Sequence, residues 1–335
     1  VRVAGGDVAK DEFAEFECDL APYGDVPRGG RLWIGRFRTS LTPTFWRGVR
    51  RGLQASKLTL TKRRGRNAHH IVEATFKAFA RALRANVDLS GALVAAPSSS
   101  SQQQQQQQSQ RQRIATKSRE TKETRVTATV QVFCDAQSRG TPPTRNTQLS
   151  CGVAAYDELL ETMVVAAGGA LECSVACSGD THIDDHHSVE DVAIVVGQCL
   201  DEALGTRAGC VRMGNAEAGD LAVVVDLSGR PHLDWQLPDM PDEWLDEAKT
   251  MAAEMVEHVF HSLATQAKLT LHVYLKEPLR FAHRSLFQQQ SPRKKRASSR
   301  DLAHDAATAF GKALADALAI DPRRGGAVPS SKGAL

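Results

Sequence analysis

The sequence predicts a globular protein of mixed α and β structure, in which strands and helices alternate along the chain. Thr124 to Phe133 alternates apolar and polar side chains, which is typical of a half-buried strand. Leu221 to Leu227 is apolar apart from Asp226 and indicates a buried strand. Glu73 to Arg84 and Asp191 to Leu204 place apolar residues at helical spacing among good helix formers, so both segments are predicted to be helices.

Length and composition narrow the class of protein. The chain has 335 residues, a formal net charge of +3, 41% hydrophobic residues and 24% charged residues. These values are close to those of ordinary globular proteins and exclude the fibrous, collagen-like and wholly disordered classes. No run approaches the roughly 18 uninterrupted apolar residues that a membrane span needs. We therefore expect a soluble protein with neither a nucleic acid nor a membrane as its partner.

The cysteines and the first residue bear on the compartment. Seven cysteines occur without a Cys-x-x-Cys pair. An odd number at this spacing fits neither a disulfide framework nor a zinc ribbon, so a reducing compartment is expected. The sequence begins with Val1 rather than Met, so a targeting segment is not observable. The expected location is cytoplasmic or plastid.

A Ser/Gln-rich tract divides the chain. Four serines and seven glutamines run from Ser98 to Gln108, and a polar, basic stretch follows. Such a tract lacks the apolar surface that would offset its ordering entropy, so residues 98–116 are predicted to be a disordered linker. The linker separates a module of residues 1–97 from a module of residues 117–335. The basic stretch 286–301 is interpreted as a solvated insert, with a nuclear-import or nucleic-acid patch as the less favoured alternative.

The two modules share short segments in the same order. His70 to Phe76 echoes His304 to Phe310, with His and Phe six positions apart and an Ala-rich helix following in both. Leu58 to Leu60 likewise echoes Leu269 to Leu271. The N-terminal module is therefore interpreted as a second copy of the last third of the chain.

Two histidine doublets share the form His-His-x-x-Glu. They comprise His69, His70 and Glu73, and His186, His187 and Glu190. In each, the first His and the Glu are four residues apart, which places them one turn apart on one helix face. The second His points about a quarter-turn away, so one element offers ligands to two centres. Imidazole and carboxylate together suit Mn, Fe, Zn or Ni, and the repetition predicts a two-metal site rather than chance surface histidines.

Four longer strings resemble one family. They are Gly179 to Gln198, Arg66 to Arg84, Val225 to Pro231 and Pro329 to Leu335. They resemble imidazoleglycerol-phosphate dehydratase of histidine biosynthesis, with residues 117–335 as a nearly complete copy and residues 1–97 as the latter half of another. In the nearly complete copy the two halves would be about 117–213 and 214–335.

The resemblance implies a fold and an assembly. The fold class is α+β, with duplicated ribosomal S5 domain 2-like α/β halves, each a sheet backed by helices. The family forms homo-oligomers, a 24-subunit shell, with two Mn²⁺ per active site at subunit contacts. Its substrate is a small-molecule phosphate.

The resemblance also implies site residues. Glu123 in Arg-x-Thr-x-Glu-Thr matches the acid/base carboxylate, and Lys77 and Asp184 also lie in matching catalytic motifs. The metal ligands implied are His69, His70, Glu73, His186, His187, Glu190, His272 and Glu158, the last replacing a family histidine. The phosphate-binding positions implied are Arg212, Arg230, Ser330, Ser331 and Lys332, although Arg230 and Lys332 would otherwise be interpreted as ordinary surface charge.

The implied reaction explains the need for metals. Dehydration of imidazole glycerol phosphate removes hydrogen from a carbon without an adjacent carbonyl, so the imidazole ring must accept the developing charge. Metals on the ring nitrogens stabilise that charge, while a carboxylate such as Glu123 moves protons.

The sequence departs from the family pattern in both modules. In the second His-His-x-x-Glu motif of the larger module, Ala303 stands at the first His and Ala307 at the Glu, and Gly311 stands opposite Lys77. The smaller module has Thr61 where the family has a histidine. One hypothesis is that the intact motifs of the two modules complement each other in an active enzyme. The alternative is a degenerate, non-catalytic subunit with a structural or regulatory role.

Overall fold

The computed structural model describes the chain as two compact units, Val1–Ala96 and Pro97–Leu335, each considered by itself. The described residues are 2–4, 16–19, 33–34, 37–38, 41–53, 57–61, 68–88, 113–134, 147–181, 185–237, 239–276 and 297–330. Most of the predicted linker and of the predicted basic insert lies outside these ranges. Among the described residues, no helix has both the length and the hydropathy of a bilayer span.

The second unit begins with a four-stranded mixed sheet in the order β6-β7-β9-β8. Its strands are β6 (Arg113–Glu120), β7 (Thr124–Val132), β8 (Leu149–Ser150) and β9 (Leu171–Gly179). Only the β8–β9 pair is parallel. Buried and more exposed residues alternate strictly along β7, as the sequence predicts for a half-buried strand. Helices α4 (Ala154–Ala166) and α5 (His186–Leu204) belong to this half.

A second four-stranded mixed sheet follows in the order β10-β11-β13-β12. Its strands are β10 (Met213–Ala218), β11 (Leu221–Asp226), β12 (His232–Gln236) and β13 (Thr270–Leu275), with helices α6 (Met255–Gln266), α7 (Ser299–Leu318) and the short η2 (Pro322–Arg324). Again one edge pair, β12–β13, is parallel and the other pairs are antiparallel. Five of the six residues of β11 are buried, which confirms the predicted buried strand.

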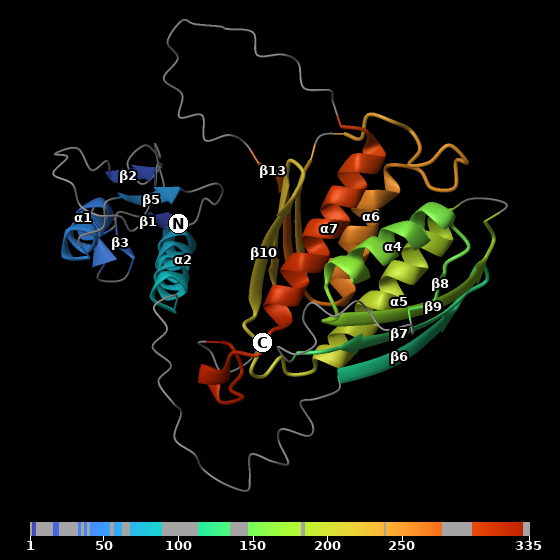
Figure 1. Cartoon of the computed structure of the whole chain (residues 1–335), viewed down its shortest axis with the longest axis horizontal. Helices are drawn as coiled ribbons and strands as arrows, with labels where there is room; N and C mark the ends of the chain where they lie inside the picture. Colours follow the sequence, from blue (N-terminus) through green and yellow to red (C-terminus); the bar gives the residue numbers. More distant parts are fainter. Residues whose placement is uncertain are drawn as a thin grey trace, which may run out of the picture. The chain divides into compact units, whose positions relative to one another are not determined.

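The helices of the two halves lie between the two sheets (Figure 1). Helix α5 packs on α6, and α4 packs on α7. Two glycines permit these close approaches: a Cβ on Gly197 of α5 would lie 2.7 Å from Gln266 Cβ, and one on Gly311 of α7 would lie 2.2 Å from the Met163 carbonyl oxygen of α4. The predicted α+β class, with two sheets backed by helices, is confirmed.

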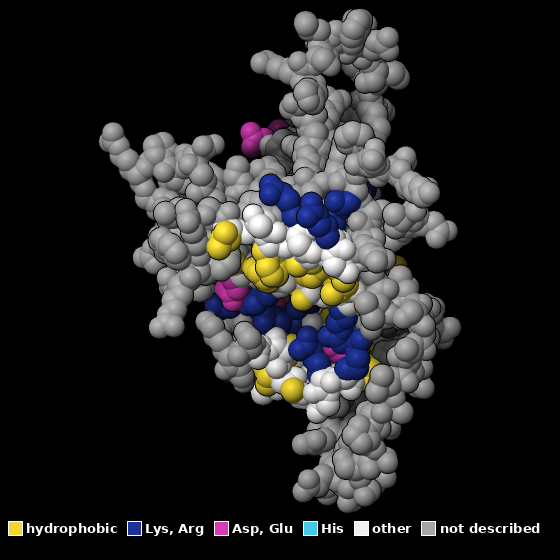
Figure 2. All heavy atoms as spheres, turned by 90° about the vertical axis from the view of Figure 1, so that its left-hand side faces the viewer, with side chains coloured by type: hydrophobic (Ala, Val, Ile, Leu, Met, Phe, Trp, Pro, Cys, Tyr) yellow, Lys and Arg dark blue, Asp and Glu magenta, His cyan; other side chains and the backbone are white. Residues whose placement is uncertain are grey.

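The first unit contains a three-stranded sheet in the order β1-β5-β2. Its elements are β1 (Arg2–Ala4), β2 (Phe16–Asp19), the hairpin β3 (Trp33–Ile34) and β4 (Phe37–Arg38), α1 (Thr42–Gly52), β5 (Lys57–Thr61) and α2 (Ala68–Asp88). Strand β5 has one antiparallel and one parallel neighbour, the relation that β13 has to β11 and β12. Buried Trp46 of α1 packs with Leu58 and Leu60 of β5. Figure 2 shows a band of hydrophobic side chains on the side that carries α1, where Phe45 and Leu41 are exposed, with Lys and Arg on both sides of it.

Two element boundaries differ from those expected. Strand β6 begins at Arg113, within the segment predicted as linker. Few residues of 113–120 are apolar, but all of them pair with β7 in an antiparallel ladder. Helix α7 begins at Ser299, within the predicted insert. Its start is fixed by a capping box, in which the Ser298 hydroxyl accepts a hydrogen bond from the Asp301 amide and the Asp301 carboxylate accepts one from the Ser298 amide.

Candidate functional site

The first turns of α5 present the His-His-x-x-Glu motif to solvent. His186 Nε2 lies 3.4 Å from Glu190 Oε2, one helical turn away, and both side chains are about 40% exposed. The His187 ring is turned away, with its centroid 6.1 Å from that of His186 and its plane at 72° to it. The structure therefore brings His186 and Glu190 together and aims His187 elsewhere, as helical geometry requires.

A carboxylate outside the motif orients His187. Its Nδ1 lies 3.3 Å from Oδ2 of Asp180, which follows the last residue of β9. When Nδ1 donates its proton to this carboxylate, Nε2 is the nitrogen left to bind a metal. Sequence reasoning missed Asp180, although it lies in the same Gly179 to Gln198 string as the doublet.

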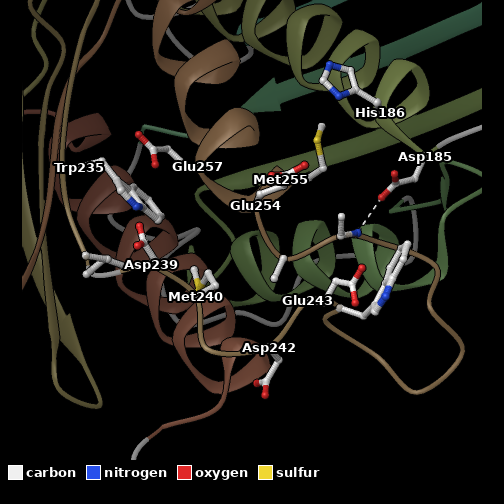
Figure 3. A pocket seen from close by; sticks show the side chains of 14 residues that line it. Asp185, His186, Trp235, Asp239, Met240, Asp242, Glu243, Glu254, Met255 and Glu257 are labelled. Carbon is white, nitrogen blue, oxygen red and sulfur yellow. Dashed lines mark hydrogen bonds between the residues drawn. The ribbon is translucent and has the colours of Figure 1, made fainter.

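Gly179 allows α5 to start this close to the sheet. A Cβ on Gly179 would lie 2.2 Å from the Ser188 hydroxyl oxygen, closer than any side chain tolerates. Asp185, just before the helix, accepts a hydrogen bond of 2.8 Å from the Ala252 amide, drawn as the dashed line in Figure 3. The close approach at Gly179 and the bond from Ala252 thus place the His-His-x-x-Glu motif against β9 on one side and against the second half on the other.

Glu123 lies at the tip of the turn between β6 and β7. The Thr121 hydroxyl oxygen accepts hydrogen bonds from the amides of Glu123, at 3.2 Å, and Thr124, at 2.9 Å. Thr124 pairs with Gly179 of β9, so this turn and the start of α5 lie at the same end of the sheet. The Glu123 side chain is exposed, and so accessible to a substrate.

His272 lies in the second sheet with a similar carboxylate neighbour. Its Nδ1 is 3.1 Å from Oδ2 of Asp234 on β12. Leu271 and Val273 on either side of it are buried, whereas His272 is half-exposed and points to the opposite face of the sheet. The His232 ring lies 5.8 Å from that of His272, centroid to centroid. Sequence reasoning missed Asp234 and His232, although their two-residue spacing on a strand puts both on one face.

Glu158 is engaged by α7. Both of its carboxylate oxygens accept hydrogen bonds from Arg300, at 2.7 and 2.8 Å, and His304 Nε2 lies 3.3 Å from it. Ala303 and Ala307 of α7 are fully buried, on the stripe that Gly311 continues against α4. The alanines that depart from the family pattern are thus buried in the core around α7.

The described part of the first unit contributes an ion pair. Glu73 and Lys77 of α2 lie one turn apart, with 2.6 Å between Oε1 and Nζ, and both are exposed. The backbone of His69 and His70 lies in the first turn of α2, and their side chains lie outside the described residues.

The predicted phosphate-binding residues fall near the end of β11 and the C-terminal segment. Arg212 donates from Nε and Nη2 to Asp226, at 2.6 and 3.0 Å, and from Nη1 to the Pro329 carbonyl at 2.9 Å. The structure therefore brings Arg212 beside Ser330, the residue after Pro329. Arg230 is exposed in the turn after β11. Three further predicted residues, Asp184, Ser331 and Lys332, lie outside the described residues.

Beside His186 there is a cavity of about 640 Å³ that the sequence did not predict. Figure 3 shows its lining, which includes Trp235 and six carboxylate side chains: Asp185, Asp239, Asp242, Glu243, Glu254 and Glu257. Fixed carboxylates repel a phosphate dianion, so this cavity is not suited to binding phosphate. The acidic residues between Asp239 and Glu247 are the feature of the sequence that could have indicated an acidic cavity here.

The donor set suits a divalent metal, but in the described ranges it occurs as pairs. No group of three His, Cys, Asp or Glu side chains among the described residues converges closely enough to hold one ion. His187 and His272 each have a carboxylate on Nδ1, the arrangement that commonly fixes a metal-binding imidazole. The imidazole and carboxylate groups present therefore suit a divalent metal in their chemistry.

The sequence is also similar to known proteins of one family. The sequence profile described as imidazoleglycerol-phosphate dehydratase matches residues 20–83 and 151–285. A protein of that name from Prochlorococcus marinus is 36% identical over 228 residues, covering 67% of this chain and 93% of the relative. One from Gloeobacter violaceus is 34% identical over 227 residues, covering 67% of this chain and 98% of the relative.

Two solved structures are also similar. A crystal structure of imidazoleglycerol-phosphate dehydratase from Staphylococcus aureus aligns with a TM-score of 0.46 and 24% identity, over 62% of this chain and 99% of that one. One from Pyrococcus furiosus, in complex with (S)-C348, aligns with a TM-score of 0.47 and 21% identity, over 65% and 100%.

Proposed function

This chain belongs to the imidazoleglycerol-phosphate dehydratase family, and we propose that it catalyses the Mn²⁺-dependent dehydration of imidazole glycerol phosphate to imidazole acetol phosphate in histidine biosynthesis. The observation that carries the proposal is the exposed motif on α5, where His186 and Glu190 share one face and Asp180 orients His187. Side chains held in this way are suited to binding metal, because their lone pairs are directed before the metal arrives.

The ligands proposed from the described residues are His186, His187, Glu190 and His272. Bound Mn²⁺ would stabilise negative charge on the imidazole ring of the substrate. Glu123 is proposed to move the proton. Its carboxylate is exposed at the tip of a turn, and Thr121 restrains the backbone of that turn. The carboxylate would therefore be accessible to a substrate carbon while its own position stays defined.

Arg230 and the C-terminal segment are proposed to bind the substrate phosphate. Arg212 has three of its N–H groups engaged by Asp226 and Pro329, so its main contribution is to hold the segment that carries Ser330. Exposed Arg230, with Ser331 and Lys332, would then supply charge and hydroxyl groups to the phosphate oxygens.

We also propose that the metal sites are completed in a homo-oligomer. The ligand pairs of the described residues are each incomplete alone. Phe45 on α1 and Phe76 on α2 are exposed apolar side chains. Exposed apolar side chains of this kind support association with a second copy of the chain. The complementation hypothesis makes Glu73 part of a working site, with Lys77 as its cationic neighbour.

The decisive experiment compares turnover of imidazole glycerol phosphate by the full chain with that of His186→Ala and Glu73→Gln, all loaded with Mn²⁺. We expect turnover in the unmodified chain and loss of turnover in His186→Ala. Loss in Glu73→Gln as well would support complementation, whereas full activity in that variant would contradict it. A control, Lys268→Ala, removes an exposed surface charge and should leave turnover unchanged.

A non-catalytic family member is the second candidate. It is favoured by Glu158, whose carboxylate is bonded to Arg300, and by Ala303 and Ala307, which are buried where the family places ligands. A folded chain that assembles but forms no product from imidazole glycerol phosphate would establish this candidate in place of the enzyme.

A further inference from the structure

Asp191 connects the metal-ligand helix to the turn that carries Glu123. It is the residue after Glu190 in α5, and it is 7% exposed. Its Oδ1 accepts a hydrogen bond of 2.8 Å from Nε of Arg119, near the end of β6. Its Oδ2 accepts one from the hydroxyl of Thr124, at the start of β7. One carboxylate thus binds both strands that flank the turn.

The turn itself is short and its backbone is already restricted. The Thr121 amide donates to the Thr124 carbonyl at 2.8 Å, and the Thr121 hydroxyl oxygen accepts from the amides of Glu123 and Thr124. These bonds fix the shape of the turn but not its distance from α5. The two bonds to Asp191 join the ends of the turn directly to α5.

Charge and burial make this connection stronger than an ordinary surface pair. Both bonds are made to an ionised acceptor, and such bonds are about twice as strong as neutral ones. The Arg119 side chain is 43% exposed, so it remains hydrated when its partner is changed. A substitution at Asp191 can therefore loosen the turn without leaving a buried, unpaired charge.

We infer that Asp191 is a positioning residue, which sets the place of the Glu123 carboxylate relative to the ligands His186 and Glu190 on the same helix. This inference rests on the proposed function. A shift of about 1 Å in a reacting group costs on the order of 100-fold in rate, so the tether should matter for turnover more than for binding.

The first test is Asp191→Asn, which keeps an acceptor for Thr124 and loses the ion pair with Arg119. We expect kcat to fall by on the order of 100-fold, with KM and Mn²⁺ content within about twofold of the unmodified chain. Asp201→Asn is the matched control, because Asp201 lies on the same helix and pairs with Arg207 and Lys268, away from the turn. A fall in kcat that only follows the loss of folded protein, or that equals the fall in Asp201→Asn, would overturn the inference.

The second test uses Thr124, which allows an isosteric pair. Thr124→Val removes the hydroxyl and should lower kcat, whereas Thr124→Ser retains the hydroxyl and should preserve most of it. Asp191→Ala removes the acceptor as well as the ion pair, so if both residues act through one contact, Thr124→Val adds little in the Asp191→Ala background. Fully multiplicative effects would show that Asp191 acts independently of Thr124 and would count against the tether.

A readout that needs no turnover separates this inference from the proposed function. Hydrogen exchange of the amides of residues 121–124 should speed up in Asp191→Asn and not in Asp201→Asn. An unmodified chain without dehydratase activity would refute the proposed function, and the exchange comparison would still decide whether Asp191 holds the turn. Unchanged exchange in Asp191→Asn would refute the tether whatever the activity.

Discussion

His187 and Asp180 form a carboxylate–imidazole pair, with 3.3 Å between Nδ1 and Oδ2, at the point where β9 gives way to α5. Asp180 is only 14% exposed, so its carboxylate is held in place. The pair determines which ring nitrogen of His187 faces outward. A residue just after β9 thus sets the orientation of a proposed metal ligand on α5.

Replacing Asp180 with Asn should weaken Mn²⁺ binding by about 10- to 100-fold, because the imidazole loses its orienting acceptor. Titration of the metal-free chain with Mn²⁺, followed by electron paramagnetic resonance of the free ion, measures this affinity. Asp201→Asn provides the comparison, since it removes a carboxylate from α5 away from the motif. Equal affinities in the three proteins would show that Asp180 has no part in metal binding.

Gly179→Ala should destabilise the fold, because the new Cβ would lie 2.2 Å from the Ser188 hydroxyl oxygen. We expect a loss of about 1–3 kcal/mol in the free energy of unfolding, typical of overpacking. Combining it with Ser188→Ala removes the closest atom and should restore part of that loss. Chemical denaturation of the two single variants and the double variant checks this, and strictly additive effects would rule out the predicted clash.

Ala307→Glu, which restores the family's residue type, should unfold the α4–α7 packing rather than create a metal site. Ala307 is fully buried, and an unpaired carboxylate there costs roughly 3 kcal/mol or more. Thr308→Glu places the same charge on the next, half-exposed position and should cost far less. The melting temperature and the bound Mn²⁺ of both variants test this. Increased Mn²⁺ binding by a stable Ala307→Glu chain would contradict it.

Cys210 should contribute stability that increases as the pH rises between about 7 and 9. A hydrogen bond from the Cys134 thiol and the charge of Arg113 lower the pKa of the Cys210 thiol from 9.0 to about 7 despite its burial. Over this window the Cys210 thiol binds more protons in the unfolded chain than in the folded one, so this group contributes an increase in the free energy of unfolding of less than about 1.4 kcal/mol per pH unit.

Cys210→Ala should remove this increase, and Cys199→Ala should retain it, because burial raises the pKa of Cys199 to about 11. Urea denaturation at pH 7, 8 and 9 gives the comparison. Parallel pH profiles for Cys210→Ala and the unmodified chain would refute the assignment.

The sequence predicted those parts of the structure that depend on local periodicity. The alternation of Thr124 to Phe133 and the apolar spacing of Asp191 to Leu204 both correspond to observed elements. The spacing of His186 and Glu190 likewise predicted one shared helix face. These features follow from the geometry of a single strand or helix.

Features that depend on partners distant in sequence were not predictable from the same patterns. The contact of Asp191 with Arg119 spans 72 positions, and that of Glu158 with Arg300 spans 142. From the sequence alone, Ala303 and Ala307 at the expected ligand positions indicate a degenerate metal-binding motif. The structure gives it a physical meaning, because those positions are buried beside Gly311, where the backbone of α7 approaches α4.

The most direct test of the proposed function measures bound metal and product on one sample. The full chain is loaded with Mn²⁺, freed of excess metal, counted for bound ion by mass spectrometry and then given imidazole glycerol phosphate. We expect at least one Mn²⁺ per chain and formation of imidazole acetol phosphate, with both lost in a His186→Ala, His187→Ala double variant. Less than one ion per chain and no product from the unmodified protein would contradict it.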